Sequence, residues 1–472
     1  MPVARCQEQP SLSTFQPFNL STYSMQFYST NKQSPAVSFK EATIKGQAPD
    51  KGLYFPEFIP QLDKDFIKNI EQYSNEEIAY RVIAPYVGEE MSEETLRRIV
   101  AETVNFPIPL VPVSAAISSL ELFHGPTLAF KDIGARFMSR CLREAVGTRT
   151  GQATRTGLAT SSGLTSTSTI TVLVATSGDT GGAVANGFYG VEGVEVVILY
   201  PSGKVSPVQE KQLTTLGGNI KALEVQGTFD DCQAMVKLAF MDKDLTSQRF
   251  LTSANSINVA RWLPQQFYYF FAYKQWKEKG QPPVISVPSG NFGNICAGIL
   301  AMQSGLPVQH FIAACNVNDI VSHYLQTQEL KPVTAVPTLS NAMYVGNPSN
   351  FVRILEIFNH QFPELKSRLS AYTITDTETE TAIRDIHEKY NYLADPHGAV
   401  GFLALERYLS NHPGQKGIFL ETAHPVKFPD AVERITGQAV PLPSSVGSIM
   451  QQEKKSVVIP PAYEALKSFL LD

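Results

Sequence analysis

The sequence predicts an α/β fold with at least two lobes, each built around a parallel β-sheet, and a helix-rich unit at its N-terminal side. Short, uncharged apolar runs recur along the chain, for example at residues 171–175, 196–200 and 284–288. A turn of small residues follows each run and leads into a helix-like segment. Apolar strands that alternate with helices are typical of parallel sheets covered on both faces. Ligands bind such sheets beyond the carboxyl ends of the strands.

Residues 25–105 form the predicted N-terminal unit. Ser92 is expected to cap a helix there, because a serine hydroxyl can accept a hydrogen bond from a free N–H group of the first turn. Apolar residues recur in this unit at intervals of three and four, which is helical spacing: Phe66, Ile70, Ile78, Val82, Met91, Leu96 and Val100.

Residues 106–440 form the predicted α/β region, with a smaller lobe at 170–250. Further strands are expected at 311–315 and 417–420, and a buried aromatic helix at 265–276. Residues 147–169 consist mostly of Thr, Ser, Gly and Ala and are interpreted as a surface insertion or disordered loop. Residues 441–472 are expected to form a C-terminal tail.

The composition argues against several classes of protein. The 472 residues include 39 Lys and Arg against 44 Asp and Glu, a net charge of −5. Without any basic run, this balance argues against a nucleic-acid binder and a polybasic membrane anchor. No apolar stretch reaches the roughly 18 residues that a membrane helix needs. The five cysteines are far apart and form no C-x-x-C pair, which fits reduced thiols in the cytoplasm.

Residues 1–24 are rich in Ser, Gln and Pro and are expected to form a flexible extension. They lack the basic start and the apolar block of a signal peptide. A transit peptide that carries Arg and Ser is the alternative interpretation.

Common catalytic motifs do not occur in the sequence: P-loop, G-x-G-x-x-G, H-E-x-x-H and G-x-S-x-G patterns are all missing. The most suggestive residue is Lys131, which follows the apolar run 128–130 and precedes a helix-like segment. Desolvation and a nearby helix dipole would lower the pKa of such a lysine and make it nucleophilic. The alternative is an ordinary surface lysine.

Three loops and one strand end add binding groups to this lysine. Residues 177–182 and 289–294 are small-residue turns between a strand and a helix, which suit a phosphate or serve as plain turns with positive φ at Gly and Asn. Residues 255–261 suit a second anion, or a helix cap with a surface Arg. Thr422 follows the strand 417–420, where its hydroxyl would bond a ring nitrogen or cap a helix. Together they suggest an imine-forming lysine with pyridoxal phosphate as cofactor.

These motifs resemble the threonine synthase family, pyridoxal-phosphate enzymes of fold type II with a tryptophan synthase β-like fold. The resemblance runs from about Met25 to beyond Ala431, and its most specific parts are 124–131 and 422–428. The loop at 289–294 is shared with serine dehydratases and cysteine synthases. Residues 1–24 and 147–169 depart from the family pattern, as does Glu421, which is bulkier and more charged than expected before Thr422. The other matching segments are 38–42, 52–56, 177–182, 200–203, 255–261 and 395–401.

The resemblance implies a role for each candidate residue. Lys131 would hold the cofactor covalently and act as the catalytic base. Thr422 would face the pyridine nitrogen, and Asp179 would lie near the phenolic oxygen of the ring. The remaining residues would bind two phosphates. The phosphate of the cofactor would be bound by Gly290, Asn291, Phe292, Gly293 and Asn294. The phosphate of the substrate would be bound by Thr180, Asn255, Ser256 and Arg261.

The implied reaction converts O-phospho-L-homoserine and water into L-threonine and phosphate, by γ-elimination and β-addition of water, without a metal. The expected protein is a cytoplasmic monomer or homodimer that binds neither nucleic acid nor membranes. One alternative is a related lyase or synthase, such as a cysteate synthase or a serine/threonine dehydratase. A non-catalytic homologue that binds the cofactor or a metabolite, and a nucleotide-binding protein, are the others. Arg261 favours a phosphorylated substrate, and the intact Lys131 argues against a non-catalytic homologue.

Overall fold

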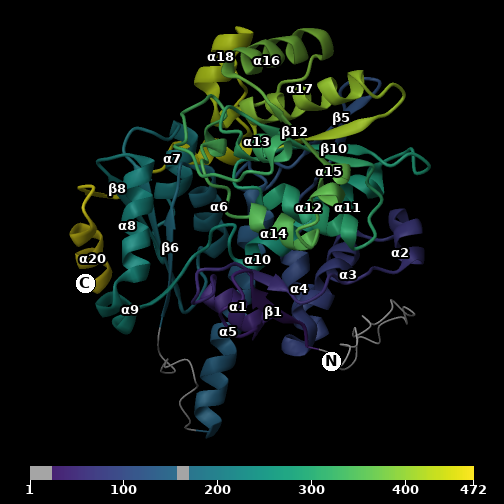
Figure 1. Cartoon of the computed structure of the whole chain (residues 1–472). Helices are drawn as coiled ribbons and strands as arrows, with labels where there is room; N and C mark the ends of the chain where they lie inside the picture. Colours follow the sequence, from purple (N-terminus) through teal and green to yellow (C-terminus); the bar gives the residue numbers. More distant parts are fainter. Residues whose placement is uncertain (1–23, 157–168) are drawn as a thin grey trace, which may run out of the picture.

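A computed structural model describes residues 24–156 and 169–472, which form an N-terminal unit and two α/β lobes (Figure 1). The predicted α/β class is confirmed. The strands predicted at 171–175, 196–200, 284–288, 311–315 and 417–420 all exist. In the part of the chain that the structure describes, no helix has both the length and the apolar character to cross a membrane.

The N-terminal unit surrounds a small antiparallel sheet that the sequence did not reveal. Its elements are β1 (Gln26–Ser29), β2 (Val37–Ser38), α1 (Phe39–Lys45), β3 (Tyr54–Pro56), α2 (Lys64–Lys68), η1 (Ile70–Gln72), α3 (Asn75–Val87), η2 (Gly88–Glu90) and α4 (Glu93–Thr103). The strand order is β2–β1–β3. Strands this short contain too few residues to show an alternating apolar pattern. The helices of this unit were visible in the sequence because their apolar residues recur at intervals of three and four. Ser92 caps α4 as predicted, with its hydroxyl 3.2 Å from the N–H of Thr95.

The large lobe contains a six-stranded sheet. Its strands are β4 (Leu110–Pro112), β5 (Ile117–Glu121), β10 (Val284–Pro288), β11 (His310–Cys315), β12 (Leu369–Thr373) and β13 (Gly417–Glu421). Their order is β12–β11–β10–β13–β5–β4, and only β4 runs antiparallel to its neighbour. Helical elements that accompany this sheet are α10 (Val259–Trp262), η3 (Leu263–Gln265), α11 (Gln266–Gln275), α12 (Gly293–Gln303), α13 (Ile320–Thr327), η4 (Asn341–Met343), α14 (Phe351–Ile357), α15 (Phe362–Arg368), α16 (Asp376–Tyr390), α17 (Pro396–Ser410), η5 (Pro425–Lys427) and α18 (Pro429–Thr436).

The small lobe contains a five-stranded parallel sheet in the order β14–β8–β7–β6–β9. Its elements are β6 (Ile170–Ala175), α6 (Asp179–Phe188), β7 (Val194–Pro201), α7 (Pro207–Thr214), β8 (Ile220–Val225), α8 (Phe229–Met241), α9 (Lys243–Gln248), β9 (Phe250–Thr252), α19 (Ser444–Met450), β14 (Val457–Ile459) and α20 (Tyr463–Leu471).

Helix α11 lies in the main core between the N-terminal unit and the large lobe. Its aromatic residues Phe267, Tyr268, Tyr269, Phe270 and Phe271 are at most 1% exposed. The buried helix predicted at 265–276 is therefore confirmed. Aromatic residues on every side of a helix leave no face for solvent, as expected for a central core helix.

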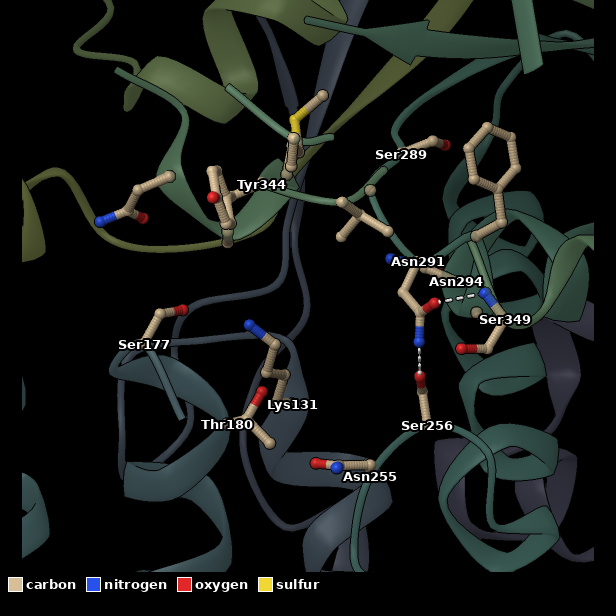
Figure 2. Close-up of a pocket in the computed structure, with 18 of the residues that line it drawn as sticks. Lys131, Ser177, Thr180, Asn255, Ser256, Ser289, Asn291, Asn294, Tyr344 and Ser349 are labelled. Carbon is tan, nitrogen blue, oxygen red and sulfur yellow. Dashed lines mark hydrogen bonds between the residues drawn. The ribbon is translucent and has the colours of Figure 1, made fainter. Parts of the chain in front are cut away.

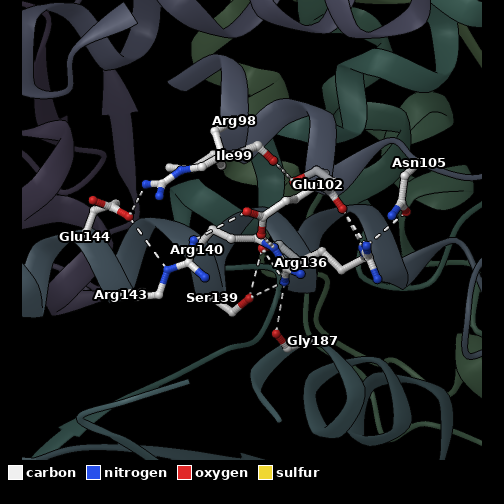
Figure 3. Close-up of polar contacts among 11 residues, drawn as sticks. Arg98, Ile99, Glu102, Asn105, Arg136, Ser139, Arg140, Arg143, Glu144 and Gly187 are labelled. Atoms are coloured by element: carbon white, nitrogen blue, oxygen red, sulfur yellow. Dashed lines mark hydrogen bonds and ion pairs between the residues drawn. The ribbon is translucent and has the colours of Figure 1, made fainter. Parts of the chain in front are cut away.

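Helix α5 (Lys131–Thr156) links the three units and begins with the candidate lysine. An ion-pair network joins its middle to α4: Arg140 Nε lies 3.0 Å from Glu102 Oε2, and Arg98 Nη2 lies 2.7 Å from Glu144 Oε1 (Figure 3). Arg140 also donates to the carbonyl oxygen of Gly187 in α6 at 3.2 Å. These contacts fix the helix relative to both neighbouring units.

The low-complexity segment 147–169 differs in part from its interpretation as a loop. Helix α5 extends to Thr156, so the first ten residues of the segment are helical. Extending an existing helix adds about one hydrogen bond per residue fixed, so α5 can continue into a sequence that would not start a helix alone. Residues 157–168, like the predicted extension up to residue 23, lie outside the described residues.

The C-terminal segment 441–472, expected as a tail, completes the small lobe. Strand β14 pairs in parallel with β8, and α20 packs against α8 (Figure 1). Leu466 of α20 is fully buried in a cluster that includes Val225, Cys232 and Met235. No local pattern in the sequence predicts that the C-terminal segment joins the sheet of the small lobe, because strand partners far apart in the chain leave no local signal.

We expect Leu466→Ala to destabilise the small lobe by about 2–5 kcal/mol, because it removes a buried side chain and leaves a cavity. Denaturant unfolding followed by circular dichroism measures the change. Leu471→Ala is the matched control, since Leu471 is 38% exposed and its truncation should cost less than about 0.5 kcal/mol. Equal effects of the two substitutions would contradict a packed C-terminal segment.

Candidate active site

A cavity of about 650 Å³ lies between the two lobes, beyond the carboxyl ends of β6 and β10. Its walls come from both sheets, from the start of α5, and from the segments 255–261 and 341–347. Side chains from these segments converge on it, with Lys131 directed into the space between the loops (Figure 2). In the described residues, no group of His, Cys, Asp or Glu side chains could hold a metal ion.

Lys131 reaches the cavity because its segment is joined to the end of β13. The N–H of Phe130 donates to the carbonyl oxygen of Thr422 at 2.9 Å, and the N–H of His424 donates to that of Leu128 at 3.0 Å. Ala129 and Ala423 form the antiparallel bridge between these two bonds. This short ladder brings together two motifs from distant parts of the sequence, and Lys131 and Thr422 both line the cavity.

The amine of Lys131 is mostly buried, and burial lowers its pKa. The carboxylate of Asp179 opposes this change from 3.9 Å, whereas the cationic groups of Lys427 and Arg261 add to it. Burial dominates, so the neutral amine is more accessible than in an ordinary lysine. This is the state that a nucleophilic or basic lysine needs.

The loop 289–294 presents the N-terminus of α12 to the cavity. Among the described residues, no side chain caps this helix, so its first N–H groups face the cavity as donors for an anion. Positive φ was expected at glycine or asparagine, but it falls on Phe292, at 60°. The ring of Phe292 packs edge-on against Phe351, 5.8 Å away, and this buried contact offsets an unfavourable backbone conformation.

Ser256 lies beside this loop and is oriented by two amides. Its hydroxyl oxygen accepts from Asn291 Nδ2 at 2.8 Å and from Asn350 Nδ2 at 3.1 Å (Figure 2 shows the first). Asn291 is itself fixed, since its Oδ1 accepts from the N–H of Ser349 at 2.7 Å. With both lone pairs engaged, Ser256 keeps its proton for a hydrogen bond to a ligand.

Two buried donors at the cavity have no hydrogen-bond partner in the part of the chain that the structure describes. Arg261 Nε and Asn294 Nδ2 make no hydrogen bond within residues 24–156 and 169–472. Arg261 is 4% exposed, has no ion-pair partner among the described carboxylates, and has its pKa lowered to about 10 by burial. Buried charges and donors are costly unless a partner satisfies them. The donor set therefore fits an anionic ligand.

Arg353 is a third buried cation, and it supports the loop that carries Ser256. It is completely buried and stacks on Trp262, with 4.2 Å between the guanidinium carbon and the ring. Its donors bond the carbonyl oxygens of Tyr54, Ser256 and Ile257 at 2.7–3.2 Å. It thereby ties the N-terminal unit to the cavity wall. No motif in the sequence pointed to this role of Arg353.

Behind Thr422, a chain of buried groups holds the end of β13. Glu421 Oε1 accepts from the N–H of Asp395 at 2.6 Å, and Asp395 Oδ2 lies 2.7 Å from His397 Nδ1. Because His397 Nε2 accepts from the N–H of Ala342, its Nδ1 carries the proton. Burial, and then the Asp395 carboxylate, raise the pKa of Glu421 well above its usual range. Burial therefore favours the protonated form of Glu421, a residue unexpected in the sequence.

Glycine at position 398 makes room for that acid. A Cβ on Gly398 would lie 1.5 Å from Glu421 Oε2. The large side chain of Glu421, which departs from the family pattern, therefore fits only because residue 398 in the segment 395–401 is a glycine.

The structure brings nearly all residues singled out in the sequence to one cavity. Asp179 is the exception, since it does not line the cavity and instead lies behind Lys131. Those that line it are Lys131, Thr180, Asn255, Ser256, Arg261, Gly290, Asn291, Phe292, Gly293, Asn294 and Thr422. Their individual roles stay predictions. Sequence reasoning assigned no role to Ser177, Tyr344, Ser349 or His397, which also line the cavity.

The fold and the site together define a class, the pyridoxal-phosphate-dependent enzymes of fold type II. Residues 110–420 match the family described as pyridoxal-phosphate dependent enzymes. Residues 26–104 match the threonine synthase N terminus, and residues 398–470 match the threonine synthase C-terminal family. The chain belongs to the threonine synthase family and is a pyridoxal-phosphate-dependent lyase, which confirms the resemblance found in the sequence.

Individual relatives agree over nearly the whole chain. Threonine synthase of Serratia marcescens is 41% identical over 448 residues, covering 95% of this chain and 99% of that one. The crystal structure of threonine synthase from Escherichia coli superposes with a TM-score of 0.85 at 40% identity, covering 95% and 99% of the two chains. The crystal structure of the pyridoxal-phosphate-bound threonine synthase from Brucella melitensis superposes with a TM-score of 0.86 at 34% identity. The match covers 95% of this chain and 99% of that one.

We expect Gly290→Ala to weaken pyridoxal-phosphate binding by about tenfold or more, since overpacking typically costs about 1–3 kcal/mol. The added Cβ would lie 2.8 Å from Met343 Cα and 3.0 Å from the Ala342 carbonyl oxygen, and this backbone cannot move freely. Absorbance titration with the cofactor measures the affinity. Gly280→Ala is the control, because nothing lies within 4 Å of its Cβ position. Wild-type affinity in Gly290→Ala would remove this loop from the cofactor site.

We expect Glu421→Gln to be more stable than the wild type at alkaline pH. Folding raises the pKa of Glu421, so the folded protein holds this proton to a higher pH than the unfolded chain does. This contribution to stability is complete below the unfolded pKa and is lost as pH rises toward the folded pKa, by about 1.4 kcal/mol per pH unit. Glutamine keeps the neutral hydrogen bonds without this loss. Denaturant unfolding at several pH values measures the slope, and Glu453→Gln, at an exposed position, should keep the wild-type slope.

Proposed function

We propose that this protein catalyses the conversion of O-phospho-L-homoserine and water into L-threonine and phosphate. One observation carries the proposal: the buried amine of Lys131 shares a cavity with the uncapped N-terminus of α12 and with the unpaired cation of Arg261. An amine that can form an imine, placed between two anion-binding groups, suits a phosphorylated cofactor and a phosphorylated substrate. The threonine synthases to which the chain is similar support the same reaction.

The residues fit pyridoxal phosphate. We assign the cofactor phosphate to the N–H groups of residues 290–294, and its aldehyde to Lys131. Thr422 would offer its hydroxyl to the pyridine nitrogen, which such a neutral partner leaves unprotonated. When bound, the cofactor supplies an electron sink for negative charge that develops on the carbon skeleton of the substrate.

Lys131 Nζ is the group that we assign to proton transfer. Burial lowers the pKa of this amine, so its neutral form is accessible and can accept the α-proton of the substrate. The carboxylate of Asp179 lies 3.9 Å from this amine.

The substrate phosphate is assigned to Arg261, Ser256, Asn255 and Thr180. Arg261 Nε and the hydroxyl proton of Ser256 are donors that the described residues leave free. A phosphate held there would be stabilised further as its bond to the γ-carbon breaks and charge accumulates on its oxygens. A buried guanidinium is therefore suited to the elimination step as well as to binding.

We also propose that the protein acts in the cytoplasm, as a monomer or a homodimer, and without nucleic acid. The four cysteines in the described part of the chain, Cys141, Cys232, Cys296 and Cys315, are buried and free, which suits a reducing compartment. Light scattering on the purified protein tests the assembly.

We expect Lys131→Ala to abolish turnover while the protein stays folded, because no other lysine lines the cavity in the part of the chain that the structure describes. Borohydride reduction of the loaded protein followed by peptide mapping should place the cofactor on Lys131. A label on another lysine would contradict the assignment.

We expect Arg261→Ala to bind pyridoxal phosphate normally but to lose about ten- to a hundredfold in kcat/KM for O-phosphohomoserine. A hydrogen bond to a charged group contributes about 1.5–3 kcal/mol. Arg261→Lys should recover only part, because lysine lacks the planar fork of donors. Steady-state kinetics on both variants measures the effect. Wild-type kcat/KM in Arg261→Ala, or release of an oxo acid from unphosphorylated serine, would favour a dehydratase instead.

A further inference from the structure

Lys427 is a second buried lysine close to Lys131. Its side chain is completely buried at the end of η5, and its Nζ lies 2.7 Å from Asp179 Oδ1. Removing an ammonium group from water is costly, and a single ion pair rarely offsets that cost. A hydrophobic residue would fill the same space without this desolvation penalty. The pair therefore calls for a functional explanation.

Asp179 connects the two lysines. Its Oδ1 accepts from Gln209 Nε2 at 2.9 Å as well as facing Lys427, and its Oδ2 lies 3.9 Å from Lys131 Nζ. Gln209 is held in turn, since its Oε1 accepts from the N–H of Ser206 at 3.1 Å. One oxygen of the carboxylate thus accepts a hydrogen bond from Gln209 and forms an ion pair with Lys427, and the other faces Lys131 beyond hydrogen-bond distance.

We propose that Lys427 is a positioning residue that neutralises Asp179, so that this carboxylate does not hold the amine of Lys131 in its protonated form. Without Lys427, Asp179 would be a bare buried carboxylate beside the amine and would favour its protonation. With Lys427, the pair carries no net charge and favours protonation of Lys131 less than a bare carboxylate would. The inference deepens the proposed function and rests on it, because it matters only if Lys131 reacts as a neutral amine.

The other charged groups around Lys131 do not replace Lys427. Arg261 also disfavours protonation of the amine, but Asp395 favours it. Asp132, the next residue in the chain, is a buried acid whose pKa is raised by burial. Burial lowers the pKa of His424 to about 4, so this ring adds no charge near neutral pH. Lys427 is the cation that pairs directly with Asp179.

The pH dependence of cofactor capture tests the inference on the full-length protein. Protein resolved from its cofactor is mixed with pyridoxal phosphate, and the growth of visible absorption is followed across the neutral and alkaline range. The midpoint of the rate profile reports the protonation of Lys131. Lys427→Met should move it up by about one pH unit or more, the usual effect of an unscreened carboxylate at this distance. The double variant Asp179→Asn/Lys427→Met should return to the wild-type midpoint, because both charges are gone.

Lys467→Met is the matched control. Lys467 also pairs with a carboxylate, Asp242, at 2.8 Å, but it lies on α20 away from the cavity. Its removal should leave the midpoint unchanged.

An unchanged midpoint in Lys427→Met would overturn the inference even if the variant were less stable, since a lysine that only supports the fold does not alter protonation of Lys131. If that variant does not fold, the double variant decides. A midpoint well below the wild type would then overturn the inference, because Asp179 would have favoured protonation of Lys131 despite Lys427. A wild-type protein that captures no pyridoxal phosphate on Lys131 would instead contradict the proposed function. The two failures are therefore distinguishable.

Discussion

The burial of one amine constrains the rest of the site. Lys131 stands at the start of α5, where the two lobes and the N-terminal unit meet, and the loss of water around it keeps its neutral form accessible. Such a position must be held by strong contacts. The ladder to the end of β13 supplies them at one end of the helix, and the Arg140–Glu102 pair supplies them further along.

The positive charge of the cavity is a second constraint on the site, and it follows from the burial of Lys131. A cavity built to take two phosphates must concentrate donors and cations where water is scarce. Arg261 and Arg353 are both buried without a carboxylate partner in the described chain, and they are stabilised in different ways. Arg353 is satisfied by backbone carbonyls and supports the wall, whereas Arg261 keeps a donor free for a ligand. The charge of Arg261 also disfavours protonation of Lys131.

The lobes are also linked across the cavity. Tyr344 of the large lobe donates from its hydroxyl to Asp230 Oδ2 of α8 at 3.2 Å, and both residues line the cavity. The small lobe that carries Asp230 is completed by β14 and α20 from the end of the chain. The C-terminal segment therefore contributes to the site through the packing of α8, although it supplies none of the residues that line the cavity.

The sequence by itself determined the α/β class, the strands that lead to the cavity, and a part of the residues that line it. Gly-rich turns, strand composition and the Lys131 motif are local features that a sequence shows directly. It also determined the family through those motifs. Only the tertiary structure placed Asp179 behind Lys131, paired it with Lys427, and raised the pKa of Glu421 in the space left by Gly398. It alone revealed Arg353 and the return of the C-terminal strand. Burial, pairing and protonation depend on neighbours that are distant in the chain, and no local pattern of residues records them.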